Sequence, residues 1–319
     1  MRSTLLFCGL ISWSSAQAQE SQPIRLLVGF APGGTTDVVA RILAKGMQDE
    51  LGRTVLVENR PGAGGQIAAQ ALKSARPDGT TLFMSNSHTV AMIPVTTRNP
   101  GFDPAKDFAP VAFVALNPDV FVVNTEVLGN PHASLRDFTE WAANNPGRGN
   151  VGVPAPASAP EFAVKVLSDA WGGDLKAAPY RGDAPIVQDL LGGQISAGIG
   201  GAGAMIPNAK EGRLRIVAVN GTERLSQLPD VPTYAELGIA GLEDQIFTGV
   251  FAPASTPSDL LQSYARAIDK VVHSQEFMEK VIPLGLTPTS GSPEQLAARV
   301  ETSRQASAEL ARAAGFQPQ

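Results

Sequence analysis

The segment GFAPGGTTD, residues 29–37, joins an apolar run to a stretch with helical spacing and has the residue types of an anion-binding loop. Gly33 and Gly34 can adopt positive φ and let a ligand approach the backbone closely. Thr35 or Thr36 can cap the following helix, which leaves first-turn amides and the positive end of the helix dipole beside the loop. Such a helix start favours a carboxylate or a phosphate. The alternative is a tight turn that binds nothing.

Two nucleotide-binding motifs do not fit this loop. No Lys-Ser or Lys-Thr pair follows the glycines, which excludes a P-loop, and Gly29, Gly33 and Gly34 lack the G-x-G-x-x-G spacing. Asp37, at the end of the segment, could itself accept hydrogen bonds from first-turn amides and would repel an anion placed deep in the loop. The residues therefore predict a site for an anion other than a nucleotide, or a ligand-free turn.

Two later loops have a similar position, each before an expected helix. In VGVPAPASAPEF, residues 151–162, Ser158 can cap the helix that Pro160 begins and leave amides free for a ligand. An ordinary N-cap is the simpler interpretation of Ser158 alone. In YRGDAP, residues 180–185, Asp183 can cap its own helix or receive an amine or hydroxyl group of a ligand.

Motifs for catalysis and metal binding are absent from the sequence. The histidines, His88, His132 and His273, form no His-Glu-x-x-His motif and no close pair, and no G-x-S-x-G nucleophile elbow occurs. His88 lies in SNSHT, residues 85–89, where an active-site histidine is one interpretation and a polar lining or solvated loop is another. An exported enzyme whose acid–base pair is assembled only by the fold stays open as an alternative.

Length and charge restrict the class of protein further. With 319 residues, the chain is expected to form two domains or one large α/β unit. The net charge is -5, and acidic and basic residues are mixed along the chain without a basic stripe. These features argue against nucleic acid or an anionic membrane surface as a partner.

The N-terminus has the pattern of an export signal. MRSTLLFCGLISWSSAQAQE contains Arg2, a short apolar run and the small-residue motif that ends at Ala18. This pattern predicts a secretory signal peptide, residues 1–18, which is cleaved after Ala18. Cys8 is the only cysteine and lies inside the signal, so we expect the mature chain to have neither disulfides nor thiolate metal sites.

Strand-like and helix-like segments alternate along the chain, which predicts parallel sheets covered by helices. The first window has expected strands at 24–30, 54–59 and 81–86, with helices at 36–51 and 66–75 between them. A second alternating window follows residue 124, and the pattern returns to the first unit near Phe247. The expected organisation is a discontinuous first domain, residues 19–123 plus 248–319, and an inserted second domain, residues 124–247. Connections near 121–125 and 246–252 would hinge the two around a cleft.

Several ordered motifs identify a family resemblance from about residue 23 to the C-terminus. They are FAPGGTTDVVARILA (30–44), VENRPGAGGQIAAQA (57–71), PDGTTL (77–82), FDPAKDFAPV (102–111), YRGDAPIVQDLLGGQI (180–195), LPDVPTYAELG (228–238) and GVFAPASTP (249–257). Together they resemble the Bug/TctC family, the extracytoplasmic solute receptors associated with tripartite tricarboxylate transporters. The resemblance implies two α/β domains in a type II periplasmic-binding-protein arrangement, whose hinged cleft closes on a small organic carboxylate.

The resemblance also implies which residues bind the ligand. In the family, backbone amides and ordered waters from two opposed loops hold the carboxylate. Carried onto this chain, one arm is Phe30, Gly34, Thr35, Thr36 and Asp37, and the other is Ala157, Ser158 and Ala159. Ser85, Asn86 and His88 would line the first-domain wall, and Tyr180 and Asp183 the second-domain wall.

The chain departs from the family pattern at the second arm and at Phe247. The second arm of the family is rich in glycine and serine, whereas Pro154 and Pro156 here remove amide donors and stiffen the segment. Phe247 stands where many members have Trp. The resemblance implies a periplasmic monomer that delivers its ligand to permease subunits and uses no cofactor or metal. A receptor that presents its closed form to a signalling sensor would use the same cleft.

Overall fold

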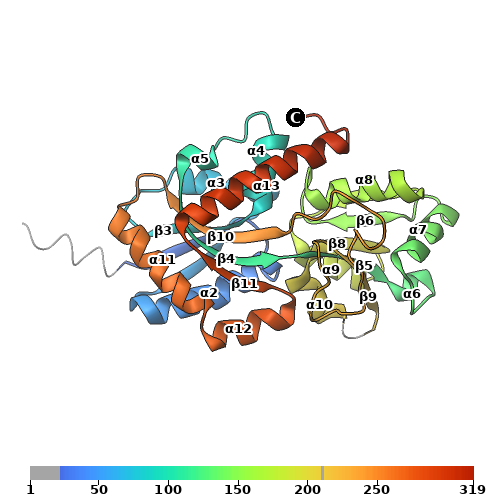
Figure 1. Ribbon diagram of the computed structural model, residues 1–319, viewed down its shortest axis with the longest axis horizontal. Helices are drawn as coiled ribbons and strands as arrows, with labels where there is room; N and C mark the ends of the chain where they lie inside the picture. The colour runs from blue at the N-terminus through green and yellow to red at the C-terminus, as the bar shows by residue number, and fades with distance from the viewer. Residues whose placement is uncertain (1–21, 210–211) are drawn as a thin grey trace, which may run out of the picture.

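The computed structural model describes residues 22–209 and 212–319. Two α/β domains lie side by side, each built on its own sheet (Figure 1). The expected signal peptide, residues 1–18, lies outside the described residues. Within the described ranges, no helix is both long and apolar enough to cross a membrane.

The first domain is built on a six-stranded sheet with the order β11-β4-β10-β3-β1-β2. Its strands are β1 (Ile24–Val28), β2 (Val55–Asn59), β3 (Thr81–Asn86), β4 (Phe108–Asn117), β10 (Ile246–Pro253) and β11 (Thr287–Gly291). Strand β1 pairs in parallel with β2 and β3, as the β-α-β-α-β pattern predicts, whereas β10 runs antiparallel to β3 and β4. The helices of this domain are α2 (Thr35–Leu51), α3 (Gln66–Lys73), α4 (Ile93–Thr96), α5 (Pro104–Asp107), α11 (Ser258–Val272), α12 (Gln275–Val281) and α13 (Pro293–Ala313), with short turns η1 (Ala63–Gly65), η2 (His88–Met92) and η3 (Ile282–Leu284).

The second domain is built on a five-stranded sheet with the order β7-β6-β8-β5-β9. Its strands are β5 (Asp119–Asn124), β6 (Asn150–Val153), β7 (Lys176–Pro179), β8 (Ala197–Gly201) and β9 (Leu214–Val219). The strand β6 pairs in parallel with β7 and β8, and β5 is antiparallel to both of its neighbours. The helices are α6 (Thr125–Leu128), α7 (Leu135–Asn144), α8 (Ala159–Trp171), α9 (Asp183–Leu191) and α10 (Ala202–Ala209).

Each sheet is covered by helices that bury their apolar faces on it. In the first domain, α2 and α11 pack on one side through residues such as Leu43 and Tyr264, and the Tyr264 hydroxyl donates to the Gly79 carbonyl at 2.6 Å. In the second domain, Phe121 of β5 packs on Phe138 of α7 with ring centroids 5.5 Å apart. Burial of each such large side chain stabilises the fold by roughly 1.5–3 kcal/mol.

The chain crosses from the first sheet to the second at Pro118. Strand β5 belongs to the second sheet, so this crossing precedes the domain boundary expected at residue 124, and the return into β10 comes at Ile246. The sequence prediction missed β4 and β5 because they form one nearly continuous apolar run from Phe108 to Asn124. The break is marked by Asn117, Asp119 and, between them, Pro118, which cannot donate to a ladder hydrogen bond.

The C-terminal helix is a further contact between the two domains. Helix α13 packs against β4 and η2 of the first domain and also contacts α8 of the second. Figure 1 shows α13 as the long red helix that runs along the first domain towards α4 and the C-terminus. Residues of both chain crossings and of α13, including Asn117, Ile246 and Ser307, line a cavity between the domains.

Candidate ligand-binding cleft

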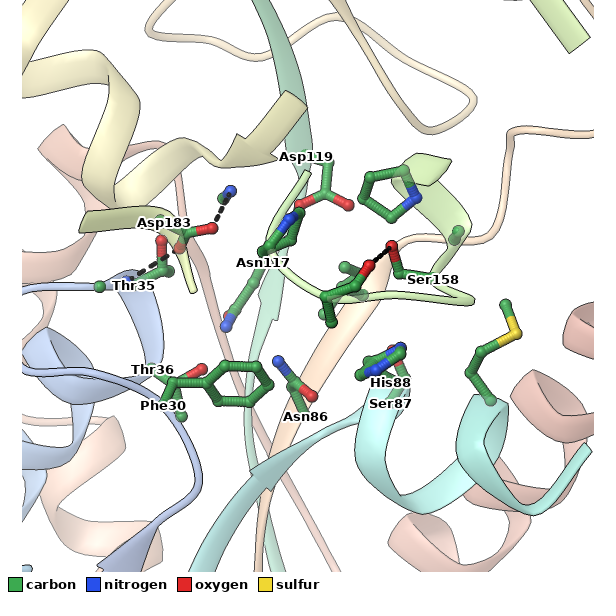
Figure 2. A pocket seen from close by; sticks show the side chains of 18 of the residues that line it. Phe30, Thr35, Thr36, Asn86, Ser87, His88, Asn117, Asp119, Ser158 and Asp183 are labelled. Atoms are coloured by element: carbon green, nitrogen blue, oxygen red, sulfur yellow. Dashed lines mark hydrogen bonds between the residues drawn. The ribbon is translucent and has the colours of Figure 1, made fainter. Parts of the chain in front are cut away.

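A cavity of about 60 Å³ lies between the two domains. One water molecule needs roughly 10–15 Å³ on this measure, so the cavity has room for several waters or a small ligand. Figure 2 shows side chains from both domains turned towards it. The lining residues are Phe30, Gly34, Thr35, Thr36, Asn86, Ser87, His88, Met92, Asn117, Asp119, Pro154, Ala155, Ser158, Ala159, Pro160, Asp183, Gly201, Asp244, Ile246 and Ser307.

The glycine loop ends at the N-terminus of α2, and its threonines do not cap that helix. Gly33 has φ 86°, as the expected turn requires. The N-cap is Gly34, which has no side chain to offer, and Thr35 and Thr36 are the first two helical residues. The prediction that a threonine caps this helix is therefore wrong. The first-turn amides are left available to groups from elsewhere.

One of those amides is taken by the second domain. The Thr35 amide donates to Oδ2 of Asp183 at 3.1 Å, and the Ala204 amide of α10 donates to Oγ1 of Thr35 at 3.1 Å. Thr35 thus links the domains with both its backbone and its side chain. Gly201 permits this approach, because a Cβ there would collide with the Thr35 side chain.

Asp183 does not cap its own helix. The N-cap of α9 is Gly182, and the Asp183 carboxylate instead accepts from the Thr35 amide and from the Gly201 amide, the latter at 3.3 Å. Burial raises the pKa of Asp183, and the two amide donors offset part of that increase. A carboxylate from the protein therefore already sits at the α2 N-terminus, beside the position expected for the ligand.

Asp37 stabilises the glycine loop and is not part of the cavity lining. Its carboxylate accepts from the Gly33 amide at 2.8 Å, from Arg41 at 3.0 Å and from Asn59 at 2.8 Å. Burial alone would raise its pKa, but these hydrogen bonds outweigh burial and lower it. Asp37 is consequently ionised and fully engaged within the first domain.

The second arm is capped by its own side chains. Oγ of Ser158 donates to the Ala155 carbonyl at 2.7 Å and accepts from the Glu161 amide at 3.3 Å. The Glu161 carboxylate in turn accepts from the Ala157 amide at 2.6 Å, where the backbone has φ 50°. Pro160 occupies the second helical position and has no amide to donate. Of the first turn of α8, this leaves the Ala159 amide for the cavity.

The remaining predicted residues divide between the lining and the interior. Asn86 lines the cavity, whereas Ser85, one residue earlier in β3, is fully buried and is not among the lining residues. Ala157 also lies off the lining. The Tyr180 hydroxyl donates to Asp189 at 2.7 Å, and burial together with that carboxylate raises the pKa of Tyr180 to about 12. Tyr180 is thus a structural residue of the second domain.

His88 begins the π-helical turn η2 and faces the cavity without a protein partner. Its side chain is buried, with 8% of the residue exposed, and neither ring nitrogen has a hydrogen-bond partner in the described part of the chain. Burial lowers the pKa of His88 to about 4. The imidazole is therefore neutral at pH 7 and can offer a ligand one donor and one acceptor.

The sequence prediction missed the cavity residues at the two chain crossings. Asn117, Asp119 and Asp244 line the cavity from the segments that connect the domains. The Asn117 side chain donates to the Thr248 hydroxyl, and Asp244 pairs with Arg299 at 2.8 Å. Polar residues that interrupt a long apolar run, as Asn117 and Asp119 do, were the available signal.

Phe247 belongs to the core of the first domain. It is fully buried, with its ring edge-to-face with Phe113 at 5.8 Å and the Arg299 guanidinium 5.5 Å above it. It is not a lining residue of the cavity. The departure from Trp at this position therefore acts on packing around Arg299.

Amides and neutral side chains dominate the donors of the cleft. No lysine or arginine occurs among the described residues that line it. Within the same described ranges, no group of His, Cys, Asp or Glu side chains is placed to hold a metal ion. An anion here would be bound by backbone amides, the helix dipole and the uncharged His88 and Asn86 side chains.

A known family model matches most of the chain. A family model described as the tripartite tricarboxylate transporter family receptor, TctC, matches residues 39–315. The chain belongs to this family. TctC proteins are periplasmic solute-binding receptors, and the family resemblance inferred from the sequence motifs is confirmed.

Individual TctC relatives are similar over nearly their full length. BugT of Bordetella pertussis is 32% identical over 288 residues, which cover 90% of this chain and 87% of BugT. The periplasmic binding protein BugD superposes with a TM-score of 0.87 and 30% identity, over 93% of this chain and 99% of BugD. The predicted two-domain periplasmic-binding-protein fold is confirmed by this match.

Two similar structures contain a named ligand. Rpa4515 of R. palustris, solved with adipate, has a TM-score of 0.87 and 29% identity, over 97% of this chain and 100% of that one. MatC of Rhodopseudomonas palustris, with bound malate, has a TM-score of 0.83 and 27% identity, over 91% of this chain and 98% of that one. Both ligands are small organic carboxylates.

Proposed function

We propose that this TctC-family receptor captures a small organic carboxylate in the interdomain cleft and delivers it to a tripartite tricarboxylate-type permease. The observation that carries the proposal is the α2 N-terminus, whose N-cap Gly34 has no side chain to offer and which borders a cavity lined by residues of both domains. The adipate and malate complexes of Rpa4515 and MatC support the same class of ligand. The ligand carboxylate would accept from first-turn amides such as that of Thr36.

The donors around this position suit a carboxylate. Thr36 supplies the second amide of α2, and the positive end of the helix dipole favours negative charge there. Ala159 supplies an amide from the second domain, and Asn86 and His88 add neutral donors. Of the predicted site residues, Phe30, Gly34, Thr36, Asn86, His88 and Ala159 make up the proposed ligand site. Ser158 fixes the loop beside Ala159, and Thr35 and Asp183 form the contact that closes the site.

Closure of the cleft would follow from the contacts between Thr35 and the second domain. The Thr35–Asp183 and Thr35–Ala204 hydrogen bonds form only when the domains meet. We assign the hinge to Pro118 and to the segment before β10, where the chain passes between the sheets. The same crossings support the division into a discontinuous first domain and an inserted second domain.

We further propose that the protein acts in the periplasm as a monomeric binding protein without cofactor or metal, and that it has no catalytic activity. The export pattern of residues 1–18 supports this location. The family supports the receptor role. The permease subunits are the partners that such a receptor requires.

The test is a ligand screen on the mature protein, beginning after Ala18. Thermal shift against a panel of mono-, di- and tricarboxylates, followed by calorimetry, should identify acids that stabilise the fold. A ligand at a hundredfold over its dissociation constant stabilises by about 2.7 kcal/mol. Methyl esters of the same acids serve as controls and should not bind. Equal binding of esters and acids, or chemical turnover of a bound acid, would contradict the proposal.

A further inference from the structure

A second chamber of about 60 Å³ adjoins the cleft on the side of the second domain. The two cavities share the lining residues Met92, Asp119, Ala159, Pro160, Asp244 and Ser307. Beyond them, the rear chamber is bounded by apolar side chains such as Ile199 and Leu242 and by Tyr234. The Tyr234 hydroxyl is buried and has no hydrogen-bond partner in the described part of the chain. Asp119 therefore lies at the junction of the two cavities.

The position of Asp119 is set by its backbone. Its amide donates to Oδ1 of Asn220 at 2.8 Å, and its carbonyl accepts from the Asn220 amide at 3.0 Å. It is also the first residue of β5 and pairs with Gly201 of β8. Pro118 precedes it and stiffens the crossing. The side chain is held towards the cavity in Figure 2, with 5% of the residue exposed.

The Asp119 carboxylate has no hydrogen-bond or ion-pair partner in residues 22–209 and 212–319. The other acidic and titratable groups that face the junction are engaged or neutral. Asp183 accepts amides from Thr35 and Gly201, and Asp244 pairs with Arg299. His88 is neutral because burial lowers its pKa to about 4. No cation of the protein neutralises Asp119, since no lysine or arginine lines either cavity among the described residues.

A buried carboxylate without a cation or donors is costly to the fold. Burial, with the nearby charge of Asp183 as a smaller contribution, raises the pKa of Asp119 well above its ordinary value. A cationic group supplied by a ligand would stabilise the ionised form and recover that cost on binding. A second ligand carboxylate at the same place would face repulsion from ionised Asp119 and from Asp183.

We propose that the ligand of this receptor carries a cationic amino group beside its carboxylate, and that Asp119 binds this ammonium group at the junction of the two chambers. The inference rests on the proposed function, because the ligand carboxylate is assigned to the α2 N-terminus across the cavity. It adds the class of substrate: a small amino-substituted organic acid. In Figure 2, Asp119 and the group of Thr36, Asn86 and His88 lie on opposite sides of the cavity, which suits a ligand with opposite charges at its two ends.

The experiment compares acids that differ only in the amino group. Calorimetry at pH 7 measures the mature protein with aspartate and succinate, with 4-aminobutyrate and butyrate, and with 5-aminovalerate and valerate. We expect the amino member of the pair that fits best to bind at least about tenfold more tightly than its partner. Asp119→Asn should abolish that preference, while Tyr234→Phe, a matched control in the rear chamber, should retain it.

Three results would overturn the inference. One is a desamino acid that binds as tightly as its amino partner to the wild-type protein, a comparison that needs no variant to fold. Another is a desamino diacid whose affinity falls as the pH rises, since that would make protonated Asp119 a donor to a second carboxylate. If no panel member binds, mass spectrometry identifies the small molecule released from the purified protein. A released molecule that contains no basic nitrogen is the third contradicting result.

Failure of the proposed function would give a different result. If 4-amino-1-butanol bound as tightly as 4-aminobutyrate, the carboxylate would contribute nothing, although the preference for an amine would stand. If butyrate bound as tightly as 4-aminobutyrate, carboxylate capture would stand and the assignment of Asp119 would fall.

Discussion

The N-termini of α2 and α8 both open into the cleft, from opposite domains, and they differ in how their amides are satisfied. Helix α2 begins after Gly34 with no side-chain cap, and its first amide is taken by Asp183 from the other domain. Helix α8 is capped by Ser158 and Glu161, which lie within four residues of each other, and Pro160 removes one amide from its first turn. The cap of α8 is supplied by its own local sequence, whereas the first amide of α2 is satisfied by a residue of the other domain.

The two sides of the cleft also differ in their titratable groups. The first-domain side has neutral His88, whereas the second-domain side has Asp119 and Asp183, whose pKa values are raised by burial. These groups affect stability in opposite directions as the pH changes.

The largest expected effect is a loss of stability through His88 as the pH falls. Because burial lowers its pKa from 6.5 to about 4, the unfolded chain binds a proton on this residue before the folded one does. The contribution of His88 to the free energy of unfolding has its full value above pH 6.5. It falls by on the order of 3 kcal/mol as the pH falls towards 4. Urea unfolding of wild type and His88→Gln between pH 7 and pH 4 measures it. A constant difference between the two proteins across that range would contradict the prediction.

The second prediction concerns a substitution that removes an amide from the first turn of α2, as Pro160 does in α8. Thr36→Pro removes the second amide of α2 at a position where proline is compatible with the helix, as Pro160 is in α8. Loss of a hydrogen bond to a charged ligand costs roughly 1.5–3 kcal/mol, so the dissociation constant should rise about 10- to 100-fold. Calorimetry with the best carboxylate from the screen tests this. Thr36→Ala, which retains the amide, is the control and should lose far less affinity.

A third, smaller effect is expected at the cap of α8. Ser158→Ala removes the hydroxyl that accepts the Glu161 amide, so the free energy of unfolding should fall by roughly 0.5–2 kcal/mol. Ligand affinity should change little, because the hydroxyl is engaged with Ala155 and Glu161. Chemical denaturation and calorimetry on the same variant separate the two effects. A large loss of affinity with unchanged stability would make Ser158 a direct ligand contact.

The smallest effect is expected for Pro160→Ala. This change restores an amide in the first turn of α8 and should alter affinity by less than about threefold, because Ser158 and Glu161 still fix the cap. Calorimetry measures the ligand affinity of Pro160→Ala and of Thr36→Pro under the same conditions, so that gain and loss of an amide at the two helix starts can be compared. A gain comparable to the loss at Thr36 would show that both helix starts bind the carboxylate equally.

Much of the fold was predictable because its signals are local. The expected strands and helices correspond to β1, α2, β2, α3 and β3 within a few residues at their ends. Strands β4 and β5 were missed because periodicity cannot divide a continuous apolar run. Their assignment to different sheets depends on which partner strands they meet, and the segment Asn117–Asp119 is the local mark of the change.

The candidate site was predictable only in part. The motifs located the two loops and the polar positions Asn86 and His88, all of which meet at the cavity. Asp37 and Tyr180 were placed at the site on the resemblance, but their hydrogen bonds lie within their own domains. Asn117, Asp119 and Asp244 reach the cavity because the chain crosses between the domains beside it, a fact that no motif contains.

The sequence by itself determined the alternation of strands and helices, the glycine turn before α2, the self-contained cap of α8 and the family, because each depends on residues close together in the chain or on ordered motifs. The tertiary structure alone decided that Asp183 accepts the first amide of α2 and that Asp119 is left unpaired. Thr35 and Asp183 are 148 residues apart, and their contact exists only because two separately folded sheets meet. Burial, which shifts the pKa values of His88 and Asp119, likewise depends on the tertiary structure.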